Sequence, residues 1–380
     1  MTIQAPEQGL TSLDRLVQEA DRQLTICNAC RYCEGFCAVF PALERRTLLG
    51  TGDIVQLANL CHDCRACFDA CMYTAPHVFD VNPPAVLSAA RLRSYDRYVW
   101  PRRVPRLFRG WLGVTAGMVI AAAITVLAAC LASGPGALVR GPASAFSPYD
   151  VIPYGPLLAL AVLPAIYGML IFYLAGRSYW HDIGGRPAGS PRLRPFAAAV
   201  GHALTLRNQR GGGADCYYPE DTEPSPTRRR LHIATVVGFG LCFLSTLSAA
   251  FSQDILGIEP PYPILSVPVI SGTIGGIGMV VGCVGLLHLK RHSSKVTSFA
   301  EMTIKDYGLL SALLFLALTG LASLVVRDTA AYPLVLVVHL SAVMLCLATA
   351  PYSKFVHVIF RFQALVRDEM EVRNQEKSLS

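Results

Sequence analysis

Eight cysteines form two groups of identical spacing near the start of the chain. The first group, named here the first comb, is Cys27, Cys30, Cys33 and Cys37. The second comb is Cys61, Cys64, Cys67 and Cys71, and each member lies 34 residues after its counterpart. Two residues between successive thiols let a short loop fold around one corner of an iron–sulfur cube and supply three iron ligands. The spacing therefore predicts iron–sulfur chemistry.

The last cysteine of each comb stands apart from the other three and points away from their loop. In the ferredoxin pattern this cysteine completes the cluster of the other comb. The predicted ligands of one 4Fe–4S cluster are Cys27, Cys30, Cys33 and Cys71, and those of the second are Cys61, Cys64, Cys67 and Cys37. The proline that usually follows the last cysteine is displaced to Pro41 and Pro76, which removes no ligand. Two close clusters serve one-electron transfer.

Zinc and disulfides are the alternative uses of these thiols. Zinc prefers two separated cysteine pairs around one tetrahedral ion, and a triple comb with a trailing cysteine would leave thiols unused. The first residues, "MTIQAPEQGL", are polar and show no secretory signal, so the cysteines are expected in the cytoplasm, where structural disulfides are rare. Iron–sulfur ligation is the favoured interpretation.

The residues around the combs read as a soluble helical module. The segment between them, "PALERRTLLGTGDIVQLANL", is rich in helix formers, and Asp53 is placed to cap its second half. We therefore expect residues 1–106 to form a cytoplasmic α-helical ferredoxin-like domain with two clusters, rather than a module built from strands.

The rest of the chain has the composition of a membrane protein. The whole sequence is 53% hydrophobic and 16% charged, whereas soluble domains carry about 25% charged residues. We expect a mainly α fold, with a six-helix transmembrane domain over 107–360, a cytoplasmic loop at 176–231 and a cytoplasmic tail at 361–380. The predicted spans lie near 111–133, 152–175, 233–251, 265–289, 307–326 and 332–352.

Lysine and arginine fall on alternate connections between these spans. Residues 91–109, 176–231 and 290–306 are basic, whereas 134–151 and 327–331 hold one arginine each. The positive-inside rule then puts both termini in the cytoplasm. The net charge of +7 follows from these flanking residues, so it indicates membrane orientation and not nucleic-acid binding.

No motif for independent catalysis stands out. Gly211 to Gly213 lack the strand and the Lys-Ser/Thr of a phosphate loop, and we interpret them as part of a connection. "SGTIGGIGMVVG" lies inside an apolar span, where small residues let helices pack closely. Whether the chain counts as an enzyme is left open, because any substrate chemistry belongs to a partner.

Three histidines are candidates for binding haem. His232 opens the third span, and His357 follows the sixth span; because the two helices run in opposite directions, both lie at one membrane depth and suit the axial positions of a b-type haem. His339 lies deeper, 18 residues before His357 and about 27 Å away along one continuous helix, where a second haem is conceivable. The alternative is that these side chains only hydrogen-bond at the interface.

The combs, the spans and several further segments, in this order, resemble the tricarballylate utilisation protein B family. These segments include "RRRLH", "PYPILSVPVISGT", "GMVVGCVGLL" and "PYSKFVH". The likeness covers nearly the whole chain, and all eight cysteines match. The chain is also similar to the carboxy-terminal half of the fused flavin, haem and iron–sulfur protein of aerobic cobalamin synthesis. The histidine spacing alone resembles the cytochrome b subunit of respiratory nitrate reductase.

This resemblance implies a multi-pass protein of the bacterial inner membrane that serves an FAD-dependent tricarballylate dehydrogenase. The flavoprotein oxidises tricarballylate to cis-aconitate, and this chain reoxidises its reduced FAD and passes electrons to quinone. One rival is another flavoprotein partner, for precorrin or other tricarboxylate oxidation. A second rival is a transporter with a redox sensor; the expected lack of acidic residues in the spans speaks against it.

Overall fold

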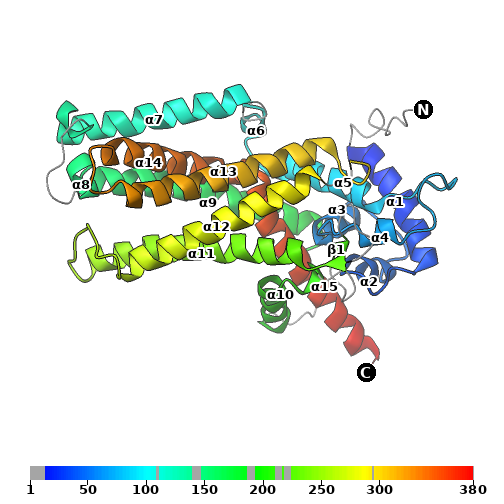
Figure 1. The fold of residues 1–380 in the computed structure, drawn as a ribbon. Coiled ribbons are helices and arrows are strands. Elements are labelled where there is room, and N and C mark those ends of the chain that lie inside the picture. Colours follow the sequence, from blue (N-terminus) through cyan, green and yellow to red (C-terminus); the bar gives the residue numbers. More distant parts are fainter. Residues whose placement is uncertain are drawn as a thin grey trace.

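The computed structural model describes residues 13–107, 111–138, 147–185, 193–209, 216–217, 224–292 and 295–379. It is nearly all helical, with one short antiparallel pair formed by β1 (Cys216–Tyr217) and β2 (Pro224–Ser225). Figure 1 shows a bundle of long helices with a smaller helical module at one end. The predicted mainly α fold is confirmed. Gly211 to Gly213 lie outside the described residues.

The smaller module contains both combs and is built from helices, as predicted. Its elements are α1 (Leu13–Cys30), α2 (Val39–Glu44), α3 (Thr51–Leu60), α4 (Ala66–Asp69) and α5 (Pro83–Tyr98). Leu24, Leu57 and Leu87 are buried in the core between α1, α3 and α5. The first turn of α3 is capped by Asp53, whose Oδ2 accepts a hydrogen bond from the Gly50 amide at 3.0 Å.

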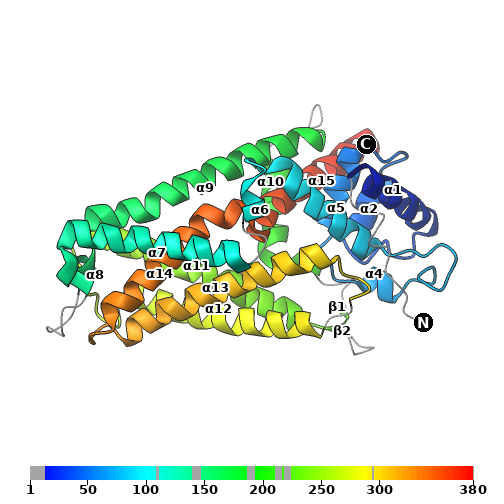
Figure 2. The ribbon, with the colours of Figure 1, turned by 90° about the horizontal axis from the view of Figure 1, so that it is seen from above.

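Six long helices form the bundle, and all are long and apolar enough to cross a bilayer. They are α7 (Trp111–Ser133), α9 (Tyr154–Asp182), α11 (Thr227–Asp254), α12 (Val267–Arg291), α13 (Ala300–Val325) and α14 (Tyr332–Thr349). Large apolar side chains point outward, such as Leu131 at 79% exposure and Leu163 at 66%, which only lipid would cover. The chain is a multi-pass membrane protein, and Figure 2 shows its helices running lengthwise.

Short elements complete the chain between the long helices. They are α6 (Val104–Leu107), the 3₁₀ turn Pro135–Leu138, α8 (Pro148–Val151), α10 (Leu193–Thr205) and the 3₁₀ turn Arg207–Gln209. In α8 the side chain of Ser147 accepts a hydrogen bond from the Tyr149 amide, which caps the helix start. Most of these elements only join spans; α10 instead packs against the C-terminal helix.

Glycines let α11 and α12 approach closely, as the small-residue segment predicts. A Cβ atom on Gly275 would stand 2.7 Å from the Gly238 carbonyl oxygen and 2.8 Å from the Cys242 amide nitrogen. Backbone atoms cannot give way, so these two helices need glycine at their contact.

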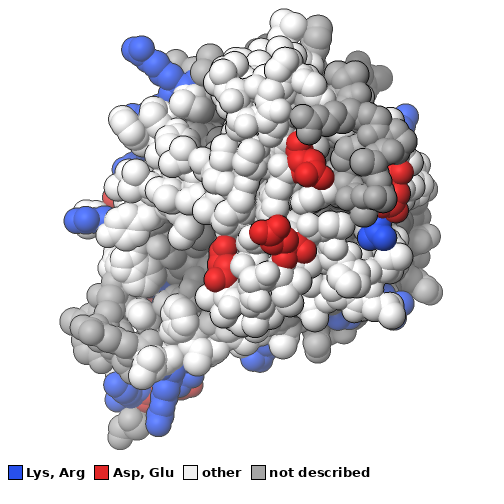
Figure 3. Space-filling model, turned by 90° about the vertical axis from the view of Figure 1, so that its left-hand side faces the viewer, with Lys and Arg blue, Asp and Glu red and all other residues white. Residues whose placement is uncertain are grey.

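The two ends of the bundle differ in charge. The far-end segments carry Asp150, Asp254, Glu259 and Asp328, and among their described residues Arg327 is the single cation. Figure 3 views this end, where uncharged and acidic surface predominates. The opposite end, beside the module, holds the basic connections.

The sixth span does not continue as one helix to His357, and this corrects the sequence expectation. After α14 the chain passes through 3₁₀ turns at Ala350–Tyr352 and Lys354–Val356 before α15 (His357–Leu379) begins. Pro351 has no amide hydrogen for the helical ladder, which accounts for the break. His339 and His357 therefore do not share one helix face. The α15 helix packs against α10 and α3 (Figure 1).

An aromatic core joins the module to the bundle. The Tyr179 ring of α9 stacks on Phe360 of α15 with centroids 4.6 Å apart, and Tyr95 and Tyr98 of α5 pack against Phe360 at 5.7 and 5.9 Å. All four rings are buried. The module is thus fixed to the bundle on the side of α15.

Candidate iron–sulfur centres and the adjoining cavity

Left-handed backbone residues shape both comb loops. Arg31 has φ 57° directly after Cys30, and Asp63 and Arg65, with φ 59° and 70°, flank Cys64. For residues other than glycine this conformation costs about 1–3 kcal/mol and persists only where surrounding structure demands it. Here it turns the loops so that their thiols converge.

The thiols gather in two adjoining hollows. The first is lined by Cys27, Cys30, Cys33 and Cys71. The second is lined by Cys37, Cys61 and Cys64, and Cys67 borders both hollows. Each comb's last cysteine thus lies with the other comb, the arrangement expected for two clusters with exchanged fourth ligands. The donor set fits two 4Fe–4S clusters, and the ligand assignment itself stays a prediction.

Burial and crowding act on the acidity of these thiols. Burial, together with the neighbouring thiols, raises the pKa of Cys27 to about 12 and that of Cys33 to about 11. Burial also raises the pKa of Cys37 and Cys67 well above the ordinary value. These groups are therefore thiols at neutral pH, and binding iron releases their protons because the thiolate is the ligand form.

Single-ion sites are a separate matter. Within the described part of the chain, no three His, Cys, Asp or Glu side chains meet closely enough to hold one metal ion. A four-iron cube separates its ligands further than one tetrahedral ion does, so this finding concerns single-ion sites.

The two hollows differ in exposure. Cys30 of the first comb is exposed, whereas Cys61 and Cys64 of the second comb are 9% and 6% exposed. His62, Asp63 and Arg65 border the second hollow and also a larger cavity beside the bundle. The second comb is therefore the one that faces the membrane helices.

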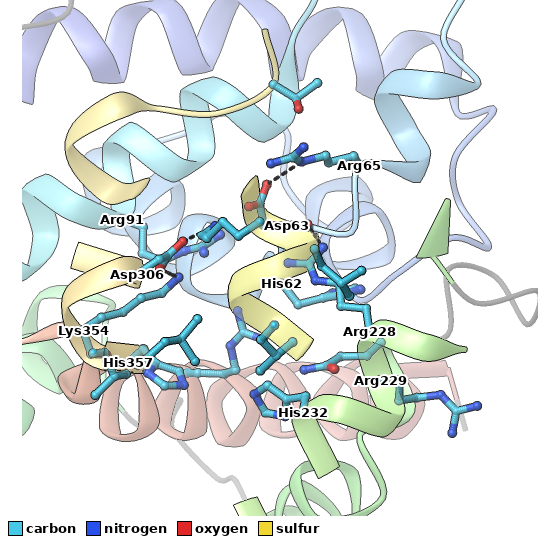
Figure 4. Close-up of a pocket in the computed structure, with 18 of the residues that line it drawn as sticks. His62, Asp63, Arg65, Arg91, Arg228, Arg229, His232, Asp306, Lys354 and His357 are labelled. Atoms are coloured by element: carbon cyan, nitrogen blue, oxygen red, sulfur yellow. Dashed lines mark hydrogen bonds and ion pairs between the residues drawn. The ribbon is translucent and has the colours of Figure 1, made fainter. Parts of the chain in front are cut away.

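This cavity has a volume of about 250 Å³, somewhat below the range of about 300–1,000 Å³ for sites of organic ligands. Leu286 and Leu289 of α12 and Leu309 and Leu310 of α13 form its apolar wall. Figure 4 shows its polar side, where His62, Asp63 and Arg65 from the loop of the second comb face residues of the bundle. These polar residues include His62, Asp63, Arg65, Arg91, Arg228, Arg229, His232, Asp306, Lys354, His357 and Arg361.

The structure brings His232 and His357 to this cavity (Figure 4). The Nδ1 atom of His357 lies 2.6 Å from the Lys354 carbonyl oxygen and donates to it, which leaves Nε2 for a ligand. Burial lowers the pKa of His357 to about 3, so the ring is neutral, as an axial ligand must be. The Nδ1 atom of His232 has no hydrogen-bond partner among the described residues. Two such imidazoles beside a leucine wall fit a b-type haem, which stays a prediction.

His339 lies elsewhere, between α13 and α14. Its Nδ1 atom is 3.0 Å from Thr319 Oγ1, and its ring packs against Gly320. It does not border the cavity. The structure therefore does not bring His339 to the other two histidines, and a second haem there stays a prediction.

A buried ionic cluster at the cavity was missed from the sequence. Asp306 is 5% exposed and forms ion pairs with Lys290 and Lys354. Because α13 begins at Ala300, this aspartate lies inside the span, and the expectation that the spans hold no acidic residue is wrong. Burial lowers the pKa of Lys354 to about 8, although Asp306 opposes that shift. The sequence feature that could have revealed this cluster is an aspartate at the start of an apolar segment.

Comparison with known proteins identifies the relatives of this chain. Residues 20–97 match the family model of the citrate utilization protein B Fer4-like domain, and residues 109–378 match that of citrate utilization protein B. The chain is 38% identical over 368 residues to citrate utilization protein B of Escherichia coli, which covers 95% of this chain and 94% of the relative. No solved structure matches. The resemblance predicted from the motifs is confirmed, and the chain belongs to the citrate utilization protein B family, with an iron–sulfur domain of the Fer4-like type.

Proposed function

We propose that this chain is a membrane-bound electron-transfer protein that reoxidises the reduced FAD of a partner tricarballylate dehydrogenase and delivers the electrons to quinone. One observation carries this proposal. The two thiol hollows adjoin each other, and the second adjoins a cavity walled by membrane helices. When bound, two 4Fe–4S clusters supply carriers for single electrons.

The chain's own residues hold these carriers and surround them largely with apolar side chains. The cysteines of the first hollow stand among Ile26, Phe40 and Val81, which are apolar. His232 and His357 offer ring nitrogens for a b-type haem in the cavity, and the leucines of α12 and α13 shield that position. Electrons that leave the second comb on this side enter the membrane domain.

The charge pattern supports an orientation in the bacterial inner membrane. The module end of the bundle is basic and the far end acidic, which the positive-inside rule reads as a cytoplasmic module. In that orientation α15 and the combs face the cytoplasm, where a soluble flavoprotein dehydrogenase would dock.

The nature of the partner's substrate is supported by likeness alone. The relative's name refers to citrate, which is a tricarboxylate like tricarballylate. A flavoprotein that oxidises another tricarboxylate, or precorrin, is the alternative partner.

The decisive experiment is anaerobic purification in mild detergent, followed by reconstitution with quinone. About eight irons per chain are expected, with a reduced α-band if haem is bound. Rapid mixing with reduced tricarballylate dehydrogenase should then reoxidise its FAD in a quinone-dependent manner. Cys64→Ala is the matched control and should abolish this reaction. Fully loaded protein that leaves the flavin reduced would overturn the proposal; activity with another flavoprotein would redirect it.

A further inference from the structure

The charges around the two thiol hollows differ sharply. Among the described residues, no charged side chain lines the first hollow. The second hollow is bordered by Asp63 and Arg65, and the cavity behind it has seven cationic residues against three acidic ones. The cations are Arg65, Arg91, Arg228, Arg229, Lys290, Lys354 and Arg361, and the acids are Asp63, Asp69 and Asp306.

Arg361 of α15 reaches the second comb directly. Its Nη2 donates a hydrogen bond to the carbonyl oxygen of Cys61 at 2.6 Å. Burial and the neighbouring Arg91 lower the pKa of Arg361 only to about 10, so the guanidinium stays charged at neutral pH. A full positive charge is therefore held against the backbone of a predicted ligand.

Two further arginines approach the second comb from different elements. Arg91 of α5 is 3% exposed, its Nε donates at 2.7 Å to the Ala58 carbonyl oxygen in the last turn of α3, and its charge acts on Cys61. Arg228 of α11 donates from Nη1 to the Asp63 carbonyl oxygen at 2.5 Å. Arg361 and Arg228 thus donate to the backbone of the second comb's loop, and Arg91 donates to the helix that leads into it.

Acidic groups do not cancel this charge. Asp306 is shared between Lys290 and Lys354, and Asp63 Oδ1 lies 3.9 Å from Arg65 Nε, so these two acids already pair with cations other than Arg361. Among the described residues, seven cations against three acids leave a surplus of positive charge around the second comb.

This surplus acts on any carrier held by the second comb. Reduction adds negative charge, which nearby cations stabilise most strongly where water is excluded. Burial alone would act in the opposite direction, because it removes the hydration of the more negative form. Buried guanidinium groups replace that hydration with fixed charge and hydrogen bonds.

We propose that Arg361, supported by Arg91 and Arg228, makes the cluster of the second comb the more oxidising of the two. Electrons that arrive at the exposed first comb then move toward the bundle and collect beside the cavity. Arg361 is a positioning residue here, because it acts through the Cys61 carbonyl and through its charge. The inference rests on the proposed electron-transfer function.

The test is a redox titration of the full-length protein, followed by electron paramagnetic resonance of both clusters. Arg361→Gln should lower the potential of the second cluster alone and reduce its share of electrons about tenfold, a one-electron shift of about 59 mV. Arg361→Lys keeps the charge and should retain most of the wild-type potential. Neither flavoprotein nor quinone is needed, so failure of the proposed function is distinguished from failure of this inference.

Arg367→Gln is the matched control, because Arg367 lies on the same helix and donates to the carbonyl oxygens of Gly184 and Gly185, away from the combs. It should change neither potential. Equal shifts of both clusters, no shift in Arg361→Gln, or a loss in Arg361→Lys equal to that in Arg361→Gln would overturn the inference. If iron analysis shows that Arg361→Gln cannot assemble the second cluster, Arg228→Gln carries the same test, with a smaller shift in the same direction.

Discussion

The two combs have one spacing and two environments. Each supplies cysteines at the same intervals, yet Cys30 of the first is exposed while Cys64 of the second is 6% exposed beneath the bundle. Ligand spacing determines which cluster a comb can bind, but the elements packed against the comb determine which electron donors and acceptors can approach that cluster. Under the proposed function, the first comb would meet the partner protein and the second would pass electrons into the membrane domain.

The difference arises from elements far away in the sequence. Exposed Tyr32 and Met72 border the first hollow, and among the described residues no bundle helix lines it. The second comb is held by hydrogen bonds from α11 and α15, which follow it by more than 150 residues. A duplicated motif therefore acquires two environments through long-range packing.

The largest effect is expected from replacing the fourth cysteine of either predicted cluster by alanine. Cys71→Ala should remove or convert the cluster of the first comb, and Cys37→Ala that of the second, because each last cysteine lies with the other comb. Iron analysis and electron paramagnetic resonance of the two variants measure this. The reverse pattern, with each variant losing the cluster of its own comb, would contradict the exchanged assignment.

Many features of the two combs and of the bundle can be predicted from the sequence, because they depend on residues close together in the chain. Comb spacing, the capping Asp53 and the six apolar segments each depend on residues close together in the chain, and the structure bears out the helices and the cap. The break at Pro351, the burial of Asp306 and the contact of Arg361 with Cys61 depend on packing between distant segments. A single-sequence argument treats a helix as continuous and a charge as solvated, and both assumptions failed at the cavity.

The next effect concerns the histidines on the side of the second comb. His357→Ala should abolish a b-type haem band and slow quinone reduction by at least about tenfold, while eight irons remain. His77→Ala is the control at the first comb, where the ring packs against Tyr73 and Phe79. His339→Ala should also keep the band. Protein without any haem band would leave His232 and His357 as hydrogen-bonding residues of the cavity.

A kinetic difference should accompany the difference in exposure. During controlled oxidation with an iron chelator, the cluster of the first comb should be lost several-fold faster, because solvent reaches Cys30 directly. Spectra resolved over time, with iron release, measure the two phases. Arg46→Gln removes the ion pair of 2.9 Å to Glu371 of α15. Because this loosens the packing of α15 near the second comb, the loss rates of the two clusters should become more similar. Equal rates in the unmodified protein would mean that the exposure difference does not protect the second cluster.

The smallest effect concerns the contact that keeps the module against α15. Asp368 pairs with Arg45, yet burial and the nearby Glu371 and Glu369 raise the pKa of Asp368 to about 6. The folded chain then binds this proton more tightly than the unfolded chain, whose aspartates titrate near 3.9, so stability declines as pH rises from about 4 through 6. Asp368→Asn keeps an acceptor for Arg45 without the charge, and should be more stable than the unmodified protein at pH 8 by about 1 kcal/mol. Apparent melting temperatures in detergent at pH 5 and 8 measure this, and Asp328→Asn at an exposed position is the control. A melting temperature of Asp368→Asn below that of the unmodified protein at pH 8 would mean that the ion pair with Arg45 outweighs the cost of the buried charge.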